Sequence, residues 1–172
     1  MLRIDDYTFN EDYTTRDTAF LFLKEEEDME SCSWSIDCSF EAGKFVTGGD
    51  DEEEYEDESV SPSICINPIE TEKHDVSELV GETFEVTNVE DAEEREDSFY
   101  IYDAEPIVEY KIQILEIKND KIRIKCNGTM SVDYEELHSF EMDSWLPIIQ
   151  DLSDWNKYNL LKLPTLKMNS VP

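Results

Sequence analysis

Apolar and polar residues alternate strictly over residues 32–40, and this two-residue period constrains the fold more than any other feature of the sequence. Cys32, Trp34, Ile36, Cys38 and Phe40 fall on one side of an extended chain, and three serines with an aspartate fall on the other. Alternate residues of a strand point to opposite faces, so this pattern predicts a half-buried strand. The polar second face is typical of an antiparallel sheet with one side in water.

Shorter runs of the same kind predict further strands along the chain. We expect them at residues 2–9, 19–23, 63–66, 99–102, 110–117, 121–126, 129–134 and 140–146. Asn119 and Asp120 stand between two of these runs and tolerate positive φ, which predicts a tight hairpin turn. Asn127-Gly128 predicts a second turn or a bulge.

Helical patterns are sparse. Asp75 and Gly81 could cap one short helical turn, and residues 153–161 predict a second short helix that ends before Pro164. Predicted strands and helices do not alternate along the chain, so the sequence gives no indication of a parallel sheet. We therefore expect one domain over residues 1–172. Its fold should be mainly β, an antiparallel sandwich or a strongly curved sheet, with one or two short helices; residues 150–172 would form a short helix and a tail.

The chain is extremely acidic, and the acid is unevenly distributed. It holds 44 acidic and 14 basic residues in 172, a formal net charge of −30. Residues 1–100 carry 32 acidic and six basic residues, whereas residues 101–172 carry 12 and eight. Such charge opposes compaction through self-repulsion. A content of 39% hydrophobic residues nevertheless predicts a folded protein rather than a disordered acidic chain.

Two acidic segments read as mobile loops, near residues 48–61 and 89–97, and a smaller acidic cluster occupies residues 25–30. All three flank predicted strands, so we expect one end of the β structure to be densely negative. The predicted partner-binding residues are the members of the two larger segments. They are Asp50, Asp51, Glu52, Glu53, Glu54, Tyr55, Glu56, Asp57 and Glu58, and Glu90, Asp91, Glu93, Glu94, Glu96 and Asp97.

The sequence contains no pattern that predicts catalysis or a cofactor. The four cysteines have no paired spacing for zinc, and we expect buried thiols. His74 and His138 belong to no recognisable triad, no glycine-rich phosphate loop occurs, and the acidic runs lack the central glycine of a calcium loop. We predict no metal site and no enzymatic activity.

The charge and the chain start also restrict partners and location. Phosphates would be repelled by residues 1–100, which argues against nucleic-acid binding. Anionic head groups would be repelled as well, and no apolar stretch approaches the roughly 20 residues of a membrane span. Residues 1–13 lack the features of a signal peptide, so we expect a cytoplasmic protein.

In its small size, its acidity and its lack of catalytic motifs, the chain resembles the immunity proteins of bacterial toxin systems. The resemblance implies a non-enzymatic protein that neutralises a basic partner, a cognate toxin. Two alternatives remain open. One is a phage-type DNA mimic that inhibits a DNA-binding protein, for which carboxylates should stand on ordered elements. The other is a structural or secretion-adaptor subunit that would use apolar C-terminal residues, listed as Trp145, Leu146, Ile148, Trp155, Leu160 and Leu161.

Overall fold

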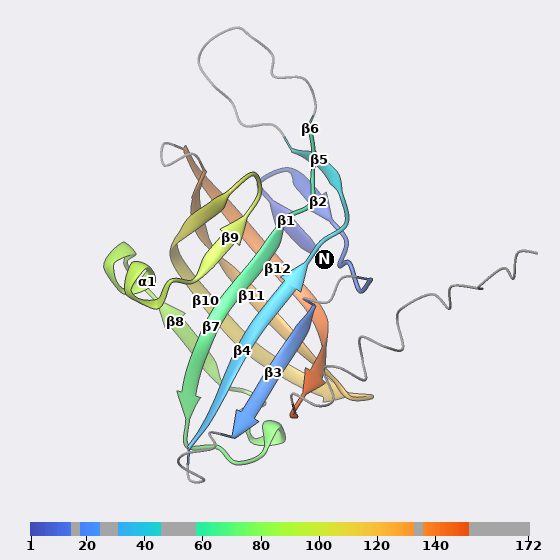
Figure 1. Ribbon diagram of the computed structural model, residues 1–172, viewed down its shortest axis with the longest axis vertical. Coiled ribbons are helices and arrows are strands. Elements are labelled where there is room, and N and C mark those ends of the chain that lie inside the picture. The colour runs from blue at the N-terminus through green and yellow to red at the C-terminus, as the bar shows by residue number, and fades with distance from the viewer. Residues whose placement is uncertain (15–17, 25–30, 46–57, 133–135, 152–172) are drawn as a thin grey trace, which may run out of the picture.

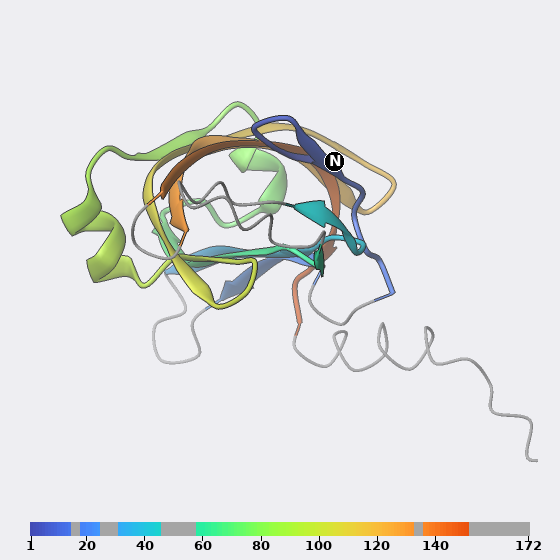
Figure 2. The ribbon, with the colours of Figure 1, turned by 90° about the horizontal axis from the view of Figure 1, so that it is seen from above.

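The computed structural model describes residues 1–14, 18–24, 31–45, 58–132 and 136–151. This part of the chain is mainly β, as predicted, and seven strands close into a barrel (Figure 1, Figure 2). The barrel strands are β3 (Ala19–Lys24), β4 (Cys32–Ser39), β7 (Ser63–Thr71), β9 (Ser98–Tyr100), β10 (Ala104–Lys118), β11 (Lys121–Val132) and β12 (Glu136–Ile149). Three shorter strands join this sheet: β1 (Leu2–Ile4), which pairs with β12, β2 (Tyr7–Phe9), which pairs with β1, and β8 (Thr83–Val86), which pairs with β10. Strands β5 (Gly43–Phe45) and β6 (Glu58–Val60) form a separate two-stranded sheet.

The closed barrel corrects our expectation of an open sandwich or curved sheet. Strand β11 pairs with β10 on one side and β12 on the other, and β12 continues past β1 to pair with β3. This last pairing is parallel and joins Ile148 to Phe20 and Ile149 to Leu21. The register of β10 against β11 shifts twice, between Ile107 and Glu109 and between Ile114 and Glu116. Such bulges increase twist and bend a strand, which helps the outer strands to meet.

The barrel interior is filled by the apolar side chains that the alternation predicted. On β4 the burial alternates residue by residue, with Cys32, Trp34, Ile36 and Cys38 inside. On the facing strand β11, Ile122, Ile124, Cys126 and Met130 are buried as well. Aromatic rings join the strands: Trp34 stacks on Phe20 at 5.5 Å and meets Phe84 edge-on at 6.1 Å. Cys32, Cys38 and Cys126 are buried free thiols, which confirms the prediction for these three, whereas the free thiol of Cys65 is half-buried.

Several predicted strands occur close to their expected bounds, but only one of the two predicted turns does. The turn at Asn119–Asp120 is confirmed, with φ of 52° and 58°. The turn at Asn127-Gly128 is wrong, because both residues lie within the continuous strand β11. The bulge lies instead on the opposite strand, β10.

The first short helix is confirmed. It is the 3₁₀ helix η1 (Val76–Leu79), and Asp75 caps it by accepting a hydrogen bond from the Ser77 amide at 2.8 Å. Glu78 completes a capping box, and Gly81 follows at φ 94°. The second predicted helix, residues 153–161, lies outside the described residues.

The expectation that the acidic segments gather at one end of the β structure stays a prediction, because two of them, residues 25–30 and 46–57, lie outside the described residues. In sequence, the first connects β3 to β4 and the second connects β5 to β6.

Gly128 on β11 lies very close to the backbone of β10. A Cβ there would fall far inside van der Waals contact of the Glu109 carbonyl oxygen and 2.9 Å from Tyr110 Cα. The Glu109 oxygen and the Tyr110 Cα are backbone atoms of β10, which its pairing with β11 holds in place. Only glycine fits this position without moving a barrel strand.

We therefore expect Gly128→Ala to lower the free energy of unfolding by about 3 kcal/mol, the upper part of the range for overpacking. Gly81→Ala is the matched control, because a Cβ at Gly81 meets nothing within 4 Å and suffers only its positive φ. It should cost about 1 kcal/mol. Urea unfolding of both variants checks this, and equal losses would contradict the close approach at Gly128.

Candidate functional site

The acidic segment near residues 89–97 is ordered, which corrects the prediction of a mobile loop. Residues Val89–Arg95 form helix α1, which lies outside the ring of strands (Figure 2). Asn88 caps the helix: its side chain accepts from the Asp91 amide at 2.9 Å and donates to the Asp91 carboxylate at 2.8 Å. Acids in the first turn and Arg95 in the last turn suit the helix dipole.

Signals for this helix were present in the sequence. Asn88 followed by Asp91, with Arg95 one turn later, is a recognisable start and end of a short helix. The acidic, low-complexity composition of the segment instead predicts a loop. The packing of the helix explains the difference, because Ala92 is buried and α1 contacts the long strand β10.

Asp97 was predicted to bind a partner, but it is 4% exposed and serves the fold. Its carboxylate accepts hydrogen bonds from Arg95 Nε at 2.7 Å, from the Asn67 amide at 2.7 Å and from the Tyr110 hydroxyl. Arg95 Nη2 also donates to the Asn67 carbonyl at 2.8 Å, and the guanidinium lies 5.0 Å from the centre of the Phe84 ring. We call Arg95, Asp97, Tyr110 and Asn67 the seam network.

The seam network bonds to the edge of β7 beyond the point where its pairing with β9 ends. Strand β7 pairs with β9 only over Ser63–Cys65, and two residues later the backbone amide and carbonyl of Asn67 bond to Asp97 and Arg95 instead. The Asn67 side chain donates to the carbonyls of Arg95 and Glu96, both at 2.9 Å. The network thus fixes the end of α1 on the barrel.

The hydrogen bonds of the seam network hold Arg95 and Tyr110 in fixed protonation states. Burial by itself lowers the pKa of Arg95, but hydrogen bonds to Tyr110 and Asp97 outweigh it and raise that pKa above its ordinary value. Burial and the hydrogen bond to Asp97 raise the pKa of Tyr110. Arg95 therefore stays a cation and Tyr110 a neutral donor.

We expect Asp97→Ala to destabilise the protein by about 3 kcal/mol, because it leaves the Arg95 cation partly buried without its partner. Tyr110→Phe should cost about 2 kcal/mol, because it removes the hydroxyl that donates to Asp97 and accepts from Arg95. Glu96→Gln, next to Asp97 but exposed, is the control and should stay within about 0.5 kcal/mol. Urea unfolding measures all three, and an Asp97→Ala loss no larger than that of the control would contradict this role.

The remaining acids of this segment face water. Glu90, Asp91, Glu94 and Glu96 are exposed, and no ion pair joins them to any cation in the described ranges. The side chain of Glu93 is not described. Of the other predicted segment, Asp50–Asp57 lie outside the described residues, and Glu58 begins β6.

The outer face of β10, β11 and β12 has the opposite character, because its cations are paired. Arg123 forms a bidentate contact with Asp143, with both nitrogen–oxygen distances 2.8 Å. Lys125 and Arg3 both contact Glu141. This face is therefore close to electrically neutral, and the excess negative charge has to be carried elsewhere.

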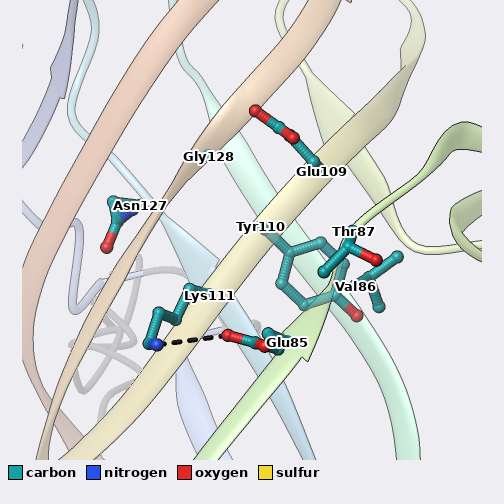
Figure 3. A pocket seen from close by; sticks show the side chains of 8 residues that line it. All are labelled: Glu85, Val86, Thr87, Glu109, Tyr110, Lys111, Asn127 and Gly128. Carbon is teal, nitrogen blue, oxygen red and sulfur yellow. Dashed lines mark hydrogen bonds and ion pairs between the residues drawn. The ribbon is translucent and has the colours of Figure 1, made fainter.

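A shallow hollow of about 160 Å³ lies on this face beside Gly128, between β8, β10 and β11 (Figure 3). The ion pair of Lys111 with Glu85, 3.1 Å, crosses one side of it, and Asn127 and Glu109 border the other (Figure 3). Its walls combine a paired cation, a paired acid and an amide. Glu109 at its border is an exposed carboxylate that accepts a long hydrogen bond of 3.4 Å from the Thr129 hydroxyl, and a single such group does not select a ligand.

The Arg123–Asp143 pair gives a pH dependence. The Arg123 hydrogen bonds hold the pKa of Asp143 below its ordinary value of about 3.9. A lowered carboxyl pKa adds stability above that ordinary value, and the stability is lost as pH falls through the folded-state pKa.

Asp143→Asn should therefore lower the free energy of unfolding at pH 7, and the difference from the parent chain should shrink at pH 3. Asp120→Asn is the matched control, since no ion pair in the described part of the chain involves Asp120. Urea unfolding at the two pH values measures this. A deficit that is equally large at pH 3 would show that the pair acts through shape rather than charge.

Other candidate chemistry is limited in the described part of the chain. No group there of three or more His, Cys, Asp and Glu side chains could hold a metal ion. His138 Nδ1 lies 2.7 Å from Asp5 Oδ2, and Asp5 Oδ1 accepts from the Ser139 amide and hydroxyl, which ties the β1–β2 turn to β12. None of the described helices has the length and apolar character needed to cross a membrane.

The chain matches no protein-family model, no curated protein and no solved structure. Its function therefore has to be inferred from its own surface.

Proposed function

We propose that this chain is a cytoplasmic, non-enzymatic binding protein that neutralises a basic protein partner, a cognate bacterial toxin. One observation carries the proposal. Helix α1 presents Glu90, Asp91 and Glu94 to water, while Arg95, the cation in the same helix, turns inward to Asp97. The helix thus keeps its outward charge uncompensated on an ordered support.

The charge density of α1 suits a partner that binds phosphates. Its seven residues span about 10 Å at ~1.5 Å each, and four of them are acidic, so one carboxylate occurs per about 2.6 Å. A DNA strand carries one charge per ~3.4 Å. The basic active site of a nuclease would therefore meet a similar density of negative charge.

Long-range attraction adds speed to such recognition. A field of this sign can raise an association rate by roughly 10- to 1000-fold over the uncharged case. Rapid capture is what an inhibitor of a toxin made in the same cell requires. The paired face of β10–β12 would contribute little to this attraction.

The proposal is tested with the products of the genes that flank this one. Each product is expressed alone and together with this chain, and growth and complex formation are measured. We expect one basic product to be toxic alone, harmless with this chain, and bound to it in a stable complex. If none is toxic and none binds, the proposal fails.

The role of α1 is tested by the association rate of that complex. The variant Glu90→Gln/Asp91→Asn/Glu94→Gln should slow association at 50 mM salt by about tenfold, and the effect should vanish in 1 M salt, where the screening length is ~3 Å. The control Glu70→Gln/Glu72→Gln/Asp120→Asn removes the same charge elsewhere. Equal slowing by both variants would mean that only net charge matters.

The order of α1 also favours a second candidate, a mimic of DNA that occupies the site of a DNA-binding protein. That function requires carboxylates on rigid elements, which α1 provides. Duplex DNA should then compete with this chain for its partner, and the partner should not be toxic. Of the residues named for the adaptor alternative, Leu146 is buried in the barrel core and Ile148 packs against that core, so these two belong to the interior rather than to an interface. Trp155, Leu160 and Leu161 lie outside the described residues.

A further inference from the structure

A second feature of the α1 region is a hollow of about 210 Å³ between the helix and the β9–β10 hairpin. Its apolar wall is formed by Ala92, Ala104, Pro106 and Ile107. This volume lies below the roughly 300–1,000 Å³ of typical small-molecule pockets. The hollow can therefore admit one long side chain but no large ligand.

The polar part of the hollow is acidic. Three of its eight lining residues, Glu96, Asp97 and Glu105, are carboxylic acids, and none is cationic. Asp97 is engaged in the seam network, whereas Glu96 is exposed at the end of α1. An entering group thus meets an apolar wall, an exposed carboxylate and two buried acids behind it.

An exposed aromatic residue stands beside the entrance. Tyr100 is 45% exposed and is the cross-strand partner of Ala104, so the two Cβ atoms lie on one face about 5 Å apart. A tyrosine ring so placed can cover the flat face of a guanidinium group. Strand register thus places Tyr100 directly beside Ala104, one of the residues that line the hollow.

We propose that this hollow receives an arginine side chain of the basic partner, as the anchor of the interface. Arginine fits better than lysine, because its guanidinium group is weakly hydrated and tolerates partial burial. The same group stacks on aromatic rings and forms bidentate hydrogen bonds with carboxylates. Arginine is also enriched among the residues that dominate binding energy. The inference rests on the proposed function for the partner's basic character; the exposed acids of α1 attract the partner and the hollow holds it.

The direct test uses N-acetyl-arginine amide as the probe and NMR of the full chain as the readout. Saturable shifts should be confined to residues around Ala92, Ala104 and Tyr100. N-acetyl-lysine amide should bind at least about threefold more weakly, a difference of ~0.7 kcal/mol. Shifts of equal size over all acidic surfaces, for both probes, would overturn the proposal.

Two variants sharpen the test. Ala104→Leu adds three carbon atoms inside the hollow without changing charge, and should weaken probe binding at least about fivefold. Glu96→Gln should weaken it as well, whereas Glu70→Gln, the same change on the exposed part of β7, should not. If Ala104→Leu perturbs the fold, Glu96→Gln against Glu70→Gln decides alone. Unchanged binding in both site variants overturns the proposal.

The two proposals can fail separately. In a complex with a basic partner, Ala104→Leu should speed dissociation about tenfold and leave association unchanged, because a buried anchor acts on dissociation. A complex that forms and is indifferent to Ala104→Leu and Glu96→Gln disproves the anchor but not the proposed function. Probe binding with no basic partner disproves the proposed function but not the hollow.

Discussion

The pairing of β11 with both of its neighbours is the constraint on which the rest of the structure depends. Strand β11 is hydrogen-bonded along its whole length, to β10 on one side and to β12 on the other. These three strands are the longest of the barrel, and their curvature brings β12 to β3. The absence of a side chain at Gly128 permits the close approach, and Tyr110 opposite it reaches the seam network.

The seam network extends this order to the acidic surface. Strand β10 changes partner from β8 to β9, and the chain between these two short strands forms α1. Arg95 and Asp97 bond to the free edge of β7 there, in place of a neighbouring strand. The consequence is electrostatic as well as structural, because the cation that could have neutralised the helix surface is used inside. Order and uncompensated charge at α1 thus have one cause.

Local patterns were reliable wherever a neighbouring residue decides the structure. The alternation on β4, the turn at Asn119–Asp120 and the cap at Asp75 depend on side-chain period, tolerance of positive φ and a local hydrogen bond. The errors involve distant partners. Asn127-Gly128 has the composition of a turn, but two long neighbours hold it in a strand. Residues 89–97 have the composition of a solvated loop, but Ala92 and Arg95 pack on strands far away in sequence.

By itself the sequence determined that the protein is mainly β, which side chains fill its interior, and that it carries a large negative charge in its first hundred residues. These properties follow from residue period and from composition, which need no partner. Tertiary structure alone decided that the sheet closes, that residues 89–95 form a helix on the barrel, and that Asp97 is buried while Glu90 and Glu94 are not. Closure and burial depend on pairings between strands that are remote in sequence. Whether a carboxylate supports the fold or stays exposed for a partner depends on whether the fold places a cation and an unpaired strand edge next to it, as it does for Asp97.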